Sequence, residues 1–199
     1  DGFRPDYLER PAAHRLRHLA DSGVRAEYLA PAFPTKTFPN HYTIATGLFP
    51  EHHGIVANTM VEPDLGRFTA ADTVVNRRPG WWGGEPIWIT AGRQGRRTAT
   101  MFWVGSEVEF GGRRADHWRP FDPFLPTEAR LDQLLAWLSL PPGERPEFAT
   151  LYLNRTDIVG HRTGPEGPAI DSAIAEVDAA VGRLVDWLHS HGLAPHTDL

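Results

Sequence analysis

Two short apolar segments separated by a helical pattern constrain the fold of this chain more than any other feature. Residues 98–104 and 148–153 are mostly apolar, β-branched or aromatic, and each has the length of a buried strand. Between them, leucines at helical spacing predict a helix that begins with a cap at Thr127. Strands that alternate with helices indicate an α/β fold around a mostly parallel sheet.

The remaining segments fit the same architecture. Helices are predicted at residues 11–22, 86–91 and 170–188, and residues 40–48 are predicted to continue a helix that begins near Thr37. A strand is predicted at 24–30, a long irregular excursion at 50–84, and a further loop around Trp118 and Phe121.

The composition is that of a soluble globular protein with one substantial core. The chain has 199 residues, of which 41% are apolar and 23% charged, and its formal net charge is −5. A negative net charge with scattered arginines argues against a surface that coats nucleic acid. No stretch has the length of a membrane span, and no signal peptide is visible.

The absence of cysteine limits the possible metal chemistry. Disulfides and thiolate metal sites are excluded, so a metal would have to bind Asp, Glu, His or hydroxyl oxygens. Ten histidines are available for this role.

Residues 33–47 contain a candidate nucleophile. Pro39 suits the first turn of a helix, which places Thr37 at or just before the helix N-terminus. Exposed N–H groups favour an anion there, and a hydroxyl can attack it if a metal or base takes the proton. The alternative is that Thr37 is simply an N-cap residue.

A second cluster follows the strand predicted at 148–153. Asp157 and His161 lie beyond the carboxyl end of that strand, where ligands bind in open α/β sheets. If this segment is helical, the two side chains face one point and could bind zinc or a similar ion. The alternative is a local Asp–His hydrogen bond that stabilises the loop.

Several motifs in order resemble the nucleotide pyrophosphatase/phosphodiesterase family of the alkaline phosphatase superfamily, of bacterial type. They are Asp1-Gly2-Phe3-Arg4 and the segments 34–40, 46–58, 81–86 and 157–165. The resemblance implies an alkaline-phosphatase-like, three-layer α/β/α fold with a mostly parallel central sheet.

The resemblance also implies roles for individual residues. Thr37 would be the nucleophile, and Asp1 would bind, together with Thr37, the zinc that activates it. Asp157 and His161 would bind a second zinc. Asn58 would contact a non-bridging phosphate oxygen.

The implied substrate is a nucleotide phosphodiester or pyrophosphate. Phe38 would pack against the nucleobase, with Phe121 on the other face. Attack would form a nucleotidyl-Thr37 intermediate and then release a nucleoside monophosphate. Phosphonoacetate hydrolases and lipid phosphodiesterases remain alternatives for the substrate, and a non-catalytic binding scaffold is an alternative of another class.

Two other members of the superfamily fit less well. A sulfatase would need Cys or Ser at the nucleophile position. The Asp-Ser-Ala signature of alkaline phosphatases occurs around Ser172, but inside the helix predicted at 170–188, where Ser172 is expected to face solvent.

The family's later Asp-His-Gly segment and a further histidine are not found after His161. We therefore expect residues 1–199 to form a single partial catalytic domain, truncated at both ends, without the first strand and the later metal ligands. Such a piece is expected to be inactive alone. The family resemblance favours a periplasmic or secreted protein.

Overall fold

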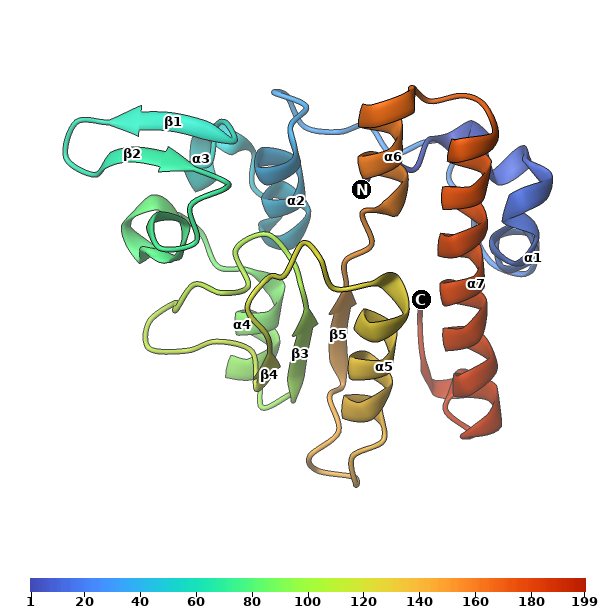
Figure 1. The fold of residues 1–199 in the computed structure, drawn as a ribbon. Coiled ribbons are helices and arrows are strands. Elements are labelled where there is room, and N and C mark those ends of the chain that lie inside the picture. Colours follow the sequence, from blue (N-terminus) through green and yellow to red (C-terminus); the bar gives the residue numbers. More distant parts are fainter. The chain divides into compact units, whose positions relative to one another are not determined.

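The computed structural model describes residues 1–199, which form two compact units (Figure 1). One unit consists of Asp1–Leu29, Leu125–Leu135 and Leu153–Leu199, and the other of Ala30–Phe124 and Ala136–Tyr152. We call them the helical unit and the sheet unit.

The helical unit is built around one long amphipathic helix. Its elements are η1 (Pro5–Glu9), η2 (Pro11–Ala13), α1 (His14–Ser22), α6 (Arg155–Thr163), α7 (Pro168–Ser190) and η5 (Ala194–His196). Both α1 and α6 pack against α7, and Figure 1 shows α6 and α7 side by side. Tyr7, Val159, Ile170 and Ile174 form part of the buried core between these elements.

The sheet unit contains the parallel sheet that the sequence predicts. Its strands β3 (Thr98–Met101), β4 (His117–Trp118) and β5 (Phe148–Leu151) lie in the order β4-β3-β5 and run parallel. Ala99 of the central strand is paired with His117 on one side and Ala149 on the other. Helix α4 (Ile87–Arg93) packs against β3 and β5.

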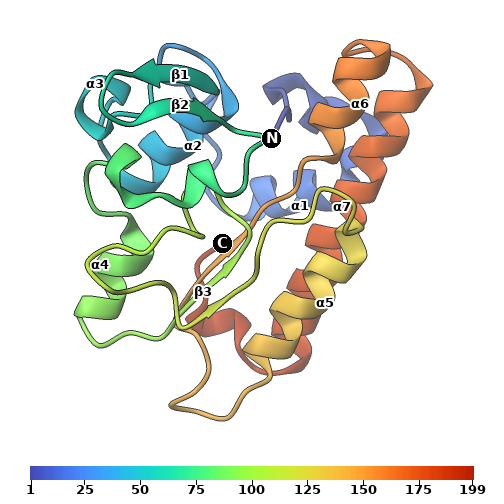
Figure 2. The same ribbon diagram turned by 60° about the vertical axis from the view of Figure 1, so that its left-hand side comes forward.

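The other elements of the sheet unit surround an aromatic core. They are α2 (Thr37–Thr46), α3 (Pro50–His53), the antiparallel hairpin of β1 (Thr59–Glu62) and β2 (Gly66–Thr69), η3 (Val75–Arg77) and η4 (Pro79–Trp81). Figure 2 shows the hairpin next to α2 and α3. The core includes Tyr42, Phe68, Trp81, Trp82 and Trp88, all of which are buried.

Most of the predicted helices are confirmed, with shifted ends. Helix α2 begins at Thr37, as the position of Pro39 predicts, and ends at Thr46, because Gly47 takes a left-handed conformation (φ 70°). Helix α1 covers 14–22, while residues 11–13 form a 3₁₀ turn. Helix α7 and the short α4 also form as predicted.

The helix α5 (Thr127–Leu138) is confirmed, but its cap is not. The N–H of Arg130 bonds to the carbonyl of Pro126, so the helix starts one residue earlier than a Thr127 cap would imply. The Thr127 hydroxyl instead donates to Glu176 at 2.5 Å.

Both predicted strands form but are shorter than expected. Strand β3 ends at Met101 because Phe102 has a positive φ of 57°, which interrupts the extended backbone. Strand β5 ends at Leu151. Trp118, which was predicted in a loop, lies in β4, while Phe121 lies in the following loop.

Two predictions are wrong. Residues 24–30 form no strand: no neighbouring strand pairs with them, and Val24, Tyr28 and Leu29 are exposed. A strand needs a hydrogen-bonding partner as well as apolar side chains. Residues 50–84 are not irregular throughout, since they contain α3 and the hairpin β1–β2. The turn residues Pro63 and Asp64, with Gly66 at φ 87°, were the missed signal.

No helix of the structure combines the length and the apolar character needed to cross a bilayer.

Candidate functional site

Thr37 is the first residue of α2, and it is not the helix cap. Lys36 holds the N-cap position in an extended conformation and makes no side-chain capping bond. The half-buried Thr37 has a hydroxyl that forms no hydrogen bond within the protein. This position leaves the hydroxyl available at the positive end of a helix of ten residues.

Asn58 supplies the capping bond that Lys36 does not. Its side-chain oxygen accepts a hydrogen bond from the backbone N–H of Phe38 at 3.0 Å. Because the oxygen is used in this way, the amide NH₂ of Asn58 is left as a donor beside the first turn of α2. An amide donor next to a helix N-terminus suits an anionic group.

Aromatic side chains contact the first turns of α2 through His41. The Nδ1 atom of His41 lies 2.8 Å from the carbonyl oxygen of Thr37, and the indole N–H of Trp103 donates to the carbonyl of His41 at 3.0 Å. The His41 ring packs edge-on against Trp103 and Tyr152, with centroids 5.3 and 5.4 Å away. The only local signal for His41 in the sequence is its helical spacing of four residues from Thr37.

Two titratable groups are buried close to α2. Burial raises the pKa of the Tyr42 phenol and lowers the pKa of the His53 imidazole. Both side chains are therefore neutral at pH 7.

A pocket of about 120 Å³ opens beside Thr37. Its walls include Thr37, Phe38, Phe102, Trp103, Phe121 and Tyr152. Thus the structure brings together three of the predicted residues, Thr37, Phe38 and Phe121. Asn58 joins them through its bond to Phe38.

The aromatic residues of the pocket are fixed by their neighbours. Phe38 packs edge-on against Phe68 at 5.8 Å, and Phe121 packs edge-on against Phe102 at 5.2 Å between ring centroids. Glu107 accepts the backbone N–H of Phe121 at 2.8 Å and also pairs with Arg77. Arg77 lies 30 positions and Phe121 14 positions from Glu107 in the chain, so no local sequence pattern could predict the contacts of Glu107.

Phe102 has a strained backbone at the edge of the pocket. Its φ of 57° is unusual for a residue with a bulky side chain, and the residue is almost fully buried. Strained residues of this kind are typical of ligand sites, where the surrounding structure holds them.

The helical unit contains the other predicted residues. Asp157 and His161 lie on one face of α6, and the carboxylate Oδ1 is 3.5 Å from the imidazole Nε2. The side chain of His161 is 80% exposed and that of Asp157 is 28% exposed. The expectation that a helical turn brings this carboxylate and imidazole together is confirmed.

Asp1 lies against the start of α6. The carbonyl oxygen of Asp1 accepts the hydroxyl of Thr156 at 2.8 Å, and its amine donates to the carbonyl of Leu153 at 2.6 Å. Gly2 has φ 69°, and a Cβ atom on it would lie 2.6 Å from the Cα of Asp157. Glycine is therefore required for the Asp1 segment to reach Asp157.

The Asp157–His161 pair fits part of a zinc site. Two donors about 2.0–2.1 Å from a tetrahedral zinc lie roughly 3.4 Å apart, close to the separation of this pair. No group of three or more His, Asp or Glu side chains in the structure could hold a metal ion. The pair thus supplies two donors, while a closed zinc site needs four.

Each set of predicted residues is assembled within its own unit. Thr37, Phe38, Asn58 and Phe121 belong to the sheet unit, whereas Asp1, Asp157 and His161 belong to the helical unit.

Comparison with known proteins places this chain in a family. The family described as Type I phosphodiesterase / nucleotide pyrophosphatase matches residues 1–199. The chain belongs to this family. Relatives include the venom phosphodiesterase CdcPDE of Crotalus durissus collilineatus, which is 42% identical over 195 residues. Ectonucleotide pyrophosphatase/phosphodiesterase family member 3 of Rattus norvegicus is 40% identical over 195 residues.

Solved structures confirm the predicted fold class. Murine ectonucleotide pyrophosphatase/phosphodiesterase 5 superimposes with a TM-score of 0.89 at 33% identity and covers 98% of this chain. The chain therefore has the α/β fold of the alkaline phosphatase superfamily. These relatives are animal proteins and do not support the expected bacterial type.

The relatives are considerably longer than this chain. It spans 24% of the Crotalus enzyme, 22% of the rat protein and 52% of the murine structure.

Proposed function

We propose that this chain carries the nucleophile and the nucleobase pocket of a zinc-dependent hydrolase of nucleotide phosphodiester or pyrophosphate bonds. The observation that carries the proposal is the unpaired hydroxyl of Thr37, on the first turn of α2, at the wall of an aromatic pocket. The family match supports the reaction class. A further solved relative, murine and 32% identical, is described as an inactive threonine-to-alanine variant in complex with AMP.

The four candidate site residues of the sheet unit have separate roles in this proposal. The Thr37 oxygen attacks phosphorus, and the NH₂ of Asn58 donates to a non-bridging oxygen whose charge increases in the transition state. Phe38 and Phe121 hold the nucleobase within the pocket, which fixes the phosphate next to Thr37. An aromatic pocket favours a base over a lipid tail or a phosphonoacetate.

The residues proposed to hold zinc are Asp1, Thr37, Asp157 and His161. Bound zinc would lower the pKa of the hydroxyl and stabilise the leaving oxygen. The remaining ligands are expected outside this chain, since Asp157 and His161 form no cluster with a third donor.

The proposed reaction has two displacements. First, the bond between Thr37 Oγ1 and phosphorus forms, the bond to the leaving oxygen breaks, and the proton of Thr37 passes through solvent to the leaving oxygen. Then a water oxygen attacks phosphorus and gives up a proton, Thr37 Oγ1 leaves and takes up a proton, and the nucleoside monophosphate is released.

The proposal also concerns the extent of the catalytic domain and the location of the protein. We expect residues 1–199 to be part of one catalytic domain that spans both units, and the chain alone to have no turnover. Venom enzymes and ectoenzymes among the relatives support a secreted or extracellular location, while a periplasmic one rests on the sequence resemblance alone.

The test uses the complete natural protein and a chromogenic nucleotide ester, p-nitrophenyl thymidine 5′-monophosphate. Thr37→Ala should abolish hydrolysis while zinc content, measured by atomic absorption, is largely retained. Unchanged hydrolysis would refute the assignment of Thr37. Nucleotide binding without hydrolysis in the wild type would instead support a binding scaffold, and zinc-dependent turnover by residues 1–199 alone would contradict the expected inactivity.

A further inference from the structure

A second pocket in the sheet unit lies at the opposite end of the parallel strands. It has a volume of about 710 Å³, and its walls come from the end of α4, from the residues just before β3 and β4, and from residues 142–147 just before β5. The Thr37 pocket, in contrast, is lined by Phe102, Trp103 and Tyr152, which follow the carboxyl ends of the strands. The two pockets share no residue.

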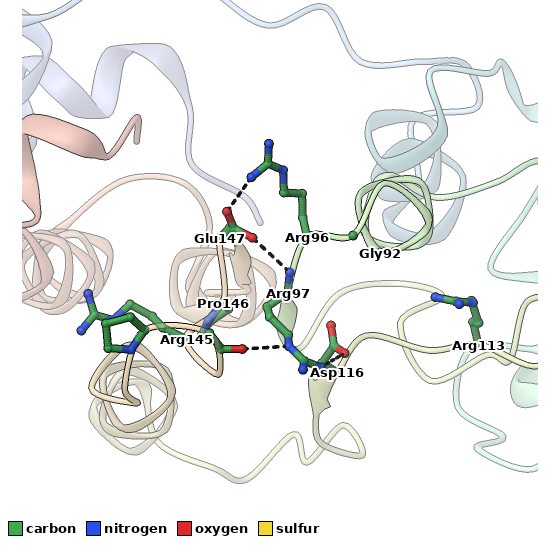
Figure 3. Close-up of a pocket in the computed structure, with 11 residues that line it drawn as sticks. Gly92, Arg96, Arg97, Arg113, Asp116, Arg145, Pro146 and Glu147 are labelled. Atoms are coloured by element: carbon green, nitrogen blue, oxygen red, sulfur yellow. Dashed lines mark hydrogen bonds and ion pairs between the residues drawn. The ribbon is translucent and has the colours of Figure 1, made fainter.

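The second pocket is rich in arginine. Arg96, Arg97, Arg113 and Arg145 contribute to its walls, against two carboxylates, Asp116 and Glu147. This is a local excess of positive charge on a chain whose net charge is −5. In Figure 3, Arg97 and Asp116 occupy the centre of the view, with Arg113 on one side and Arg145 on the other.

Two arginines of this pocket have carboxylate partners. The guanidinium of Arg97 donates to the carbonyl of Gly143 at 3.1 Å and to Asp116 at 3.0 Å. Arg96 pairs with Glu147 at 2.9 Å. Each guanidinium has five N–H donors, so these bonds leave further donors on both side chains unused.

The other two arginines have no carboxylate partner. Arg145 uses its Nε–H for the carbonyl of Leu140 at 3.1 Å. The exposed side chain of Arg113 forms no hydrogen bond or ion pair. The pocket therefore has a surplus of charged donors, which match the oxygens of phosphate groups.

The volume and the lining residues of the second pocket limit the class of ligand that it can bind. A volume of about 710 Å³ exceeds what one phosphate needs and lies in the range of small-molecule sites. The lining contains glycine, proline, arginine and acidic residues but no aromatic side chain on which a base could stack. We propose that this pocket binds a condensed phosphate, a chain of two or more phosphate groups, either free or as the phosphate end of a nucleotide.

The proposal is independent of the Thr37 chemistry and can be tested on the 199-residue chain. Isothermal titration calorimetry would measure the binding of tripolyphosphate, with ATP as the arm that distinguishes a nucleotide from a free phosphate chain. We expect tripolyphosphate to bind and Arg113→Ala to weaken its affinity about tenfold, because one charge-assisted contact is lost. Arg113 has no side-chain partner, so this variant should fold normally, as thermal unfolding would check.

Arg97→Ala gives a second measurement, with a similar expected loss of affinity. Arg67→Ala is the matched control, because Arg67 is an exposed arginine of the same unit that lies outside the pocket and has no ion pair. Tighter binding of ATP than of tripolyphosphate that is lost in Arg113→Ala would assign the pocket to nucleotides; equal binding would assign it to free phosphate chains. No binding of tripolyphosphate at millimolar concentrations would overturn the proposal. So would an equal loss in Arg67→Ala, which would indicate nonspecific charge attraction.

Discussion

The side-chain oxygen of Asn58 accepts the backbone N–H of Phe38 at 3.0 Å, and this bond joins the residue immediately before strand β1 to the first turn of α2. Asn58 thus caps the helix that carries Thr37. Asn58→Ala should lower the free energy of unfolding by about 1 kcal/mol, as loss of a helix cap does. Urea denaturation would measure this loss.

Asn58→Asp separates capping from anion binding. The carboxylate still accepts the N–H of Phe38, so stability should be retained, but it replaces the NH₂ donor by a negative charge that repels phosphate. Hydrolysis by the complete enzyme should therefore fall in both variants. Full activity in Asn58→Asp would show that the amide donor is not used.

Thr37→Ala should leave stability unchanged. The hydroxyl forms no hydrogen bond within the protein and does not cap α2, so the free energy of unfolding should change by less than about 0.5 kcal/mol. Urea denaturation of both proteins would check this. A loss of more than about 1 kcal/mol would indicate a structural role for the hydroxyl and weaken the case for a nucleophile.

Gly2→Ala should destabilise the helical unit, because the new Cβ would lie 2.6 Å from the Cα of Asp157. Gly47→Ala is a close control: its φ of 70° matches the 69° of Gly2, but nothing lies within 4 Å of its added Cβ. Both variants carry the strain of a positive φ, and Gly2→Ala should lose about 1–3 kcal/mol more from overpacking. Equal losses would mean that the contact with Asp157 relaxes freely.

Asp178→Ala should destabilise α1 and its packing on α7. The buried carboxylate accepts the N–H of Leu16 at 2.7 Å and lies 3.2 Å from Nδ1 of His14. Its loss leaves a donor of the first turn unsatisfied, with an expected cost of about 1–3 kcal/mol. Asp186→Ala, which breaks only the exposed pair with Arg15, should cost less than about 1 kcal/mol. Thermal or urea unfolding of the two variants would compare these costs.

Stability should fall as the pH is lowered below about 6.5, the ordinary pKa of histidine. Burial lowers the pKa of His53 in the folded protein, so the unfolded chain binds a proton at a higher pH than the folded one. Its Nδ1 accepts the N–H of Ile55, and its Nε2 contacts the hydroxyl of Thr43, so both nitrogens are used in the neutral form.

Urea unfolding between pH 7 and pH 5 would measure this dependence. His53→Gln should reduce its slope, whereas His52→Gln should not, because His52 is exposed. An unchanged slope in His53→Gln would contradict the assignment.

Local patterns predicted the elements that local interactions determine. The leucines of α5, the long apolar stripe of α7 and the apolar run of β3 all form the predicted elements. Spacing along a helix also predicted that Asp157 and His161 face each other. The segment 24–30 failed because a strand depends on a partner that its own residues do not specify.

Long-range contacts decided what the patterns could not. Three such contacts join residues that are distant in the chain. Gly2 lies against Asp157, Glu107 accepts the backbone N–H of Phe121, and Asp178 accepts the backbone N–H of Leu16 in the first turn of α1. The sequence by itself determined the α/β class, the family and the helix start at Thr37, because these follow from periodicity, turn chemistry and motifs. Only the tertiary structure decided that Asn58 caps α2, that Thr37 and Phe121 share a pocket, and that arginines gather at the other end of the sheet. Those arrangements depend on how the backbone brings separate segments together.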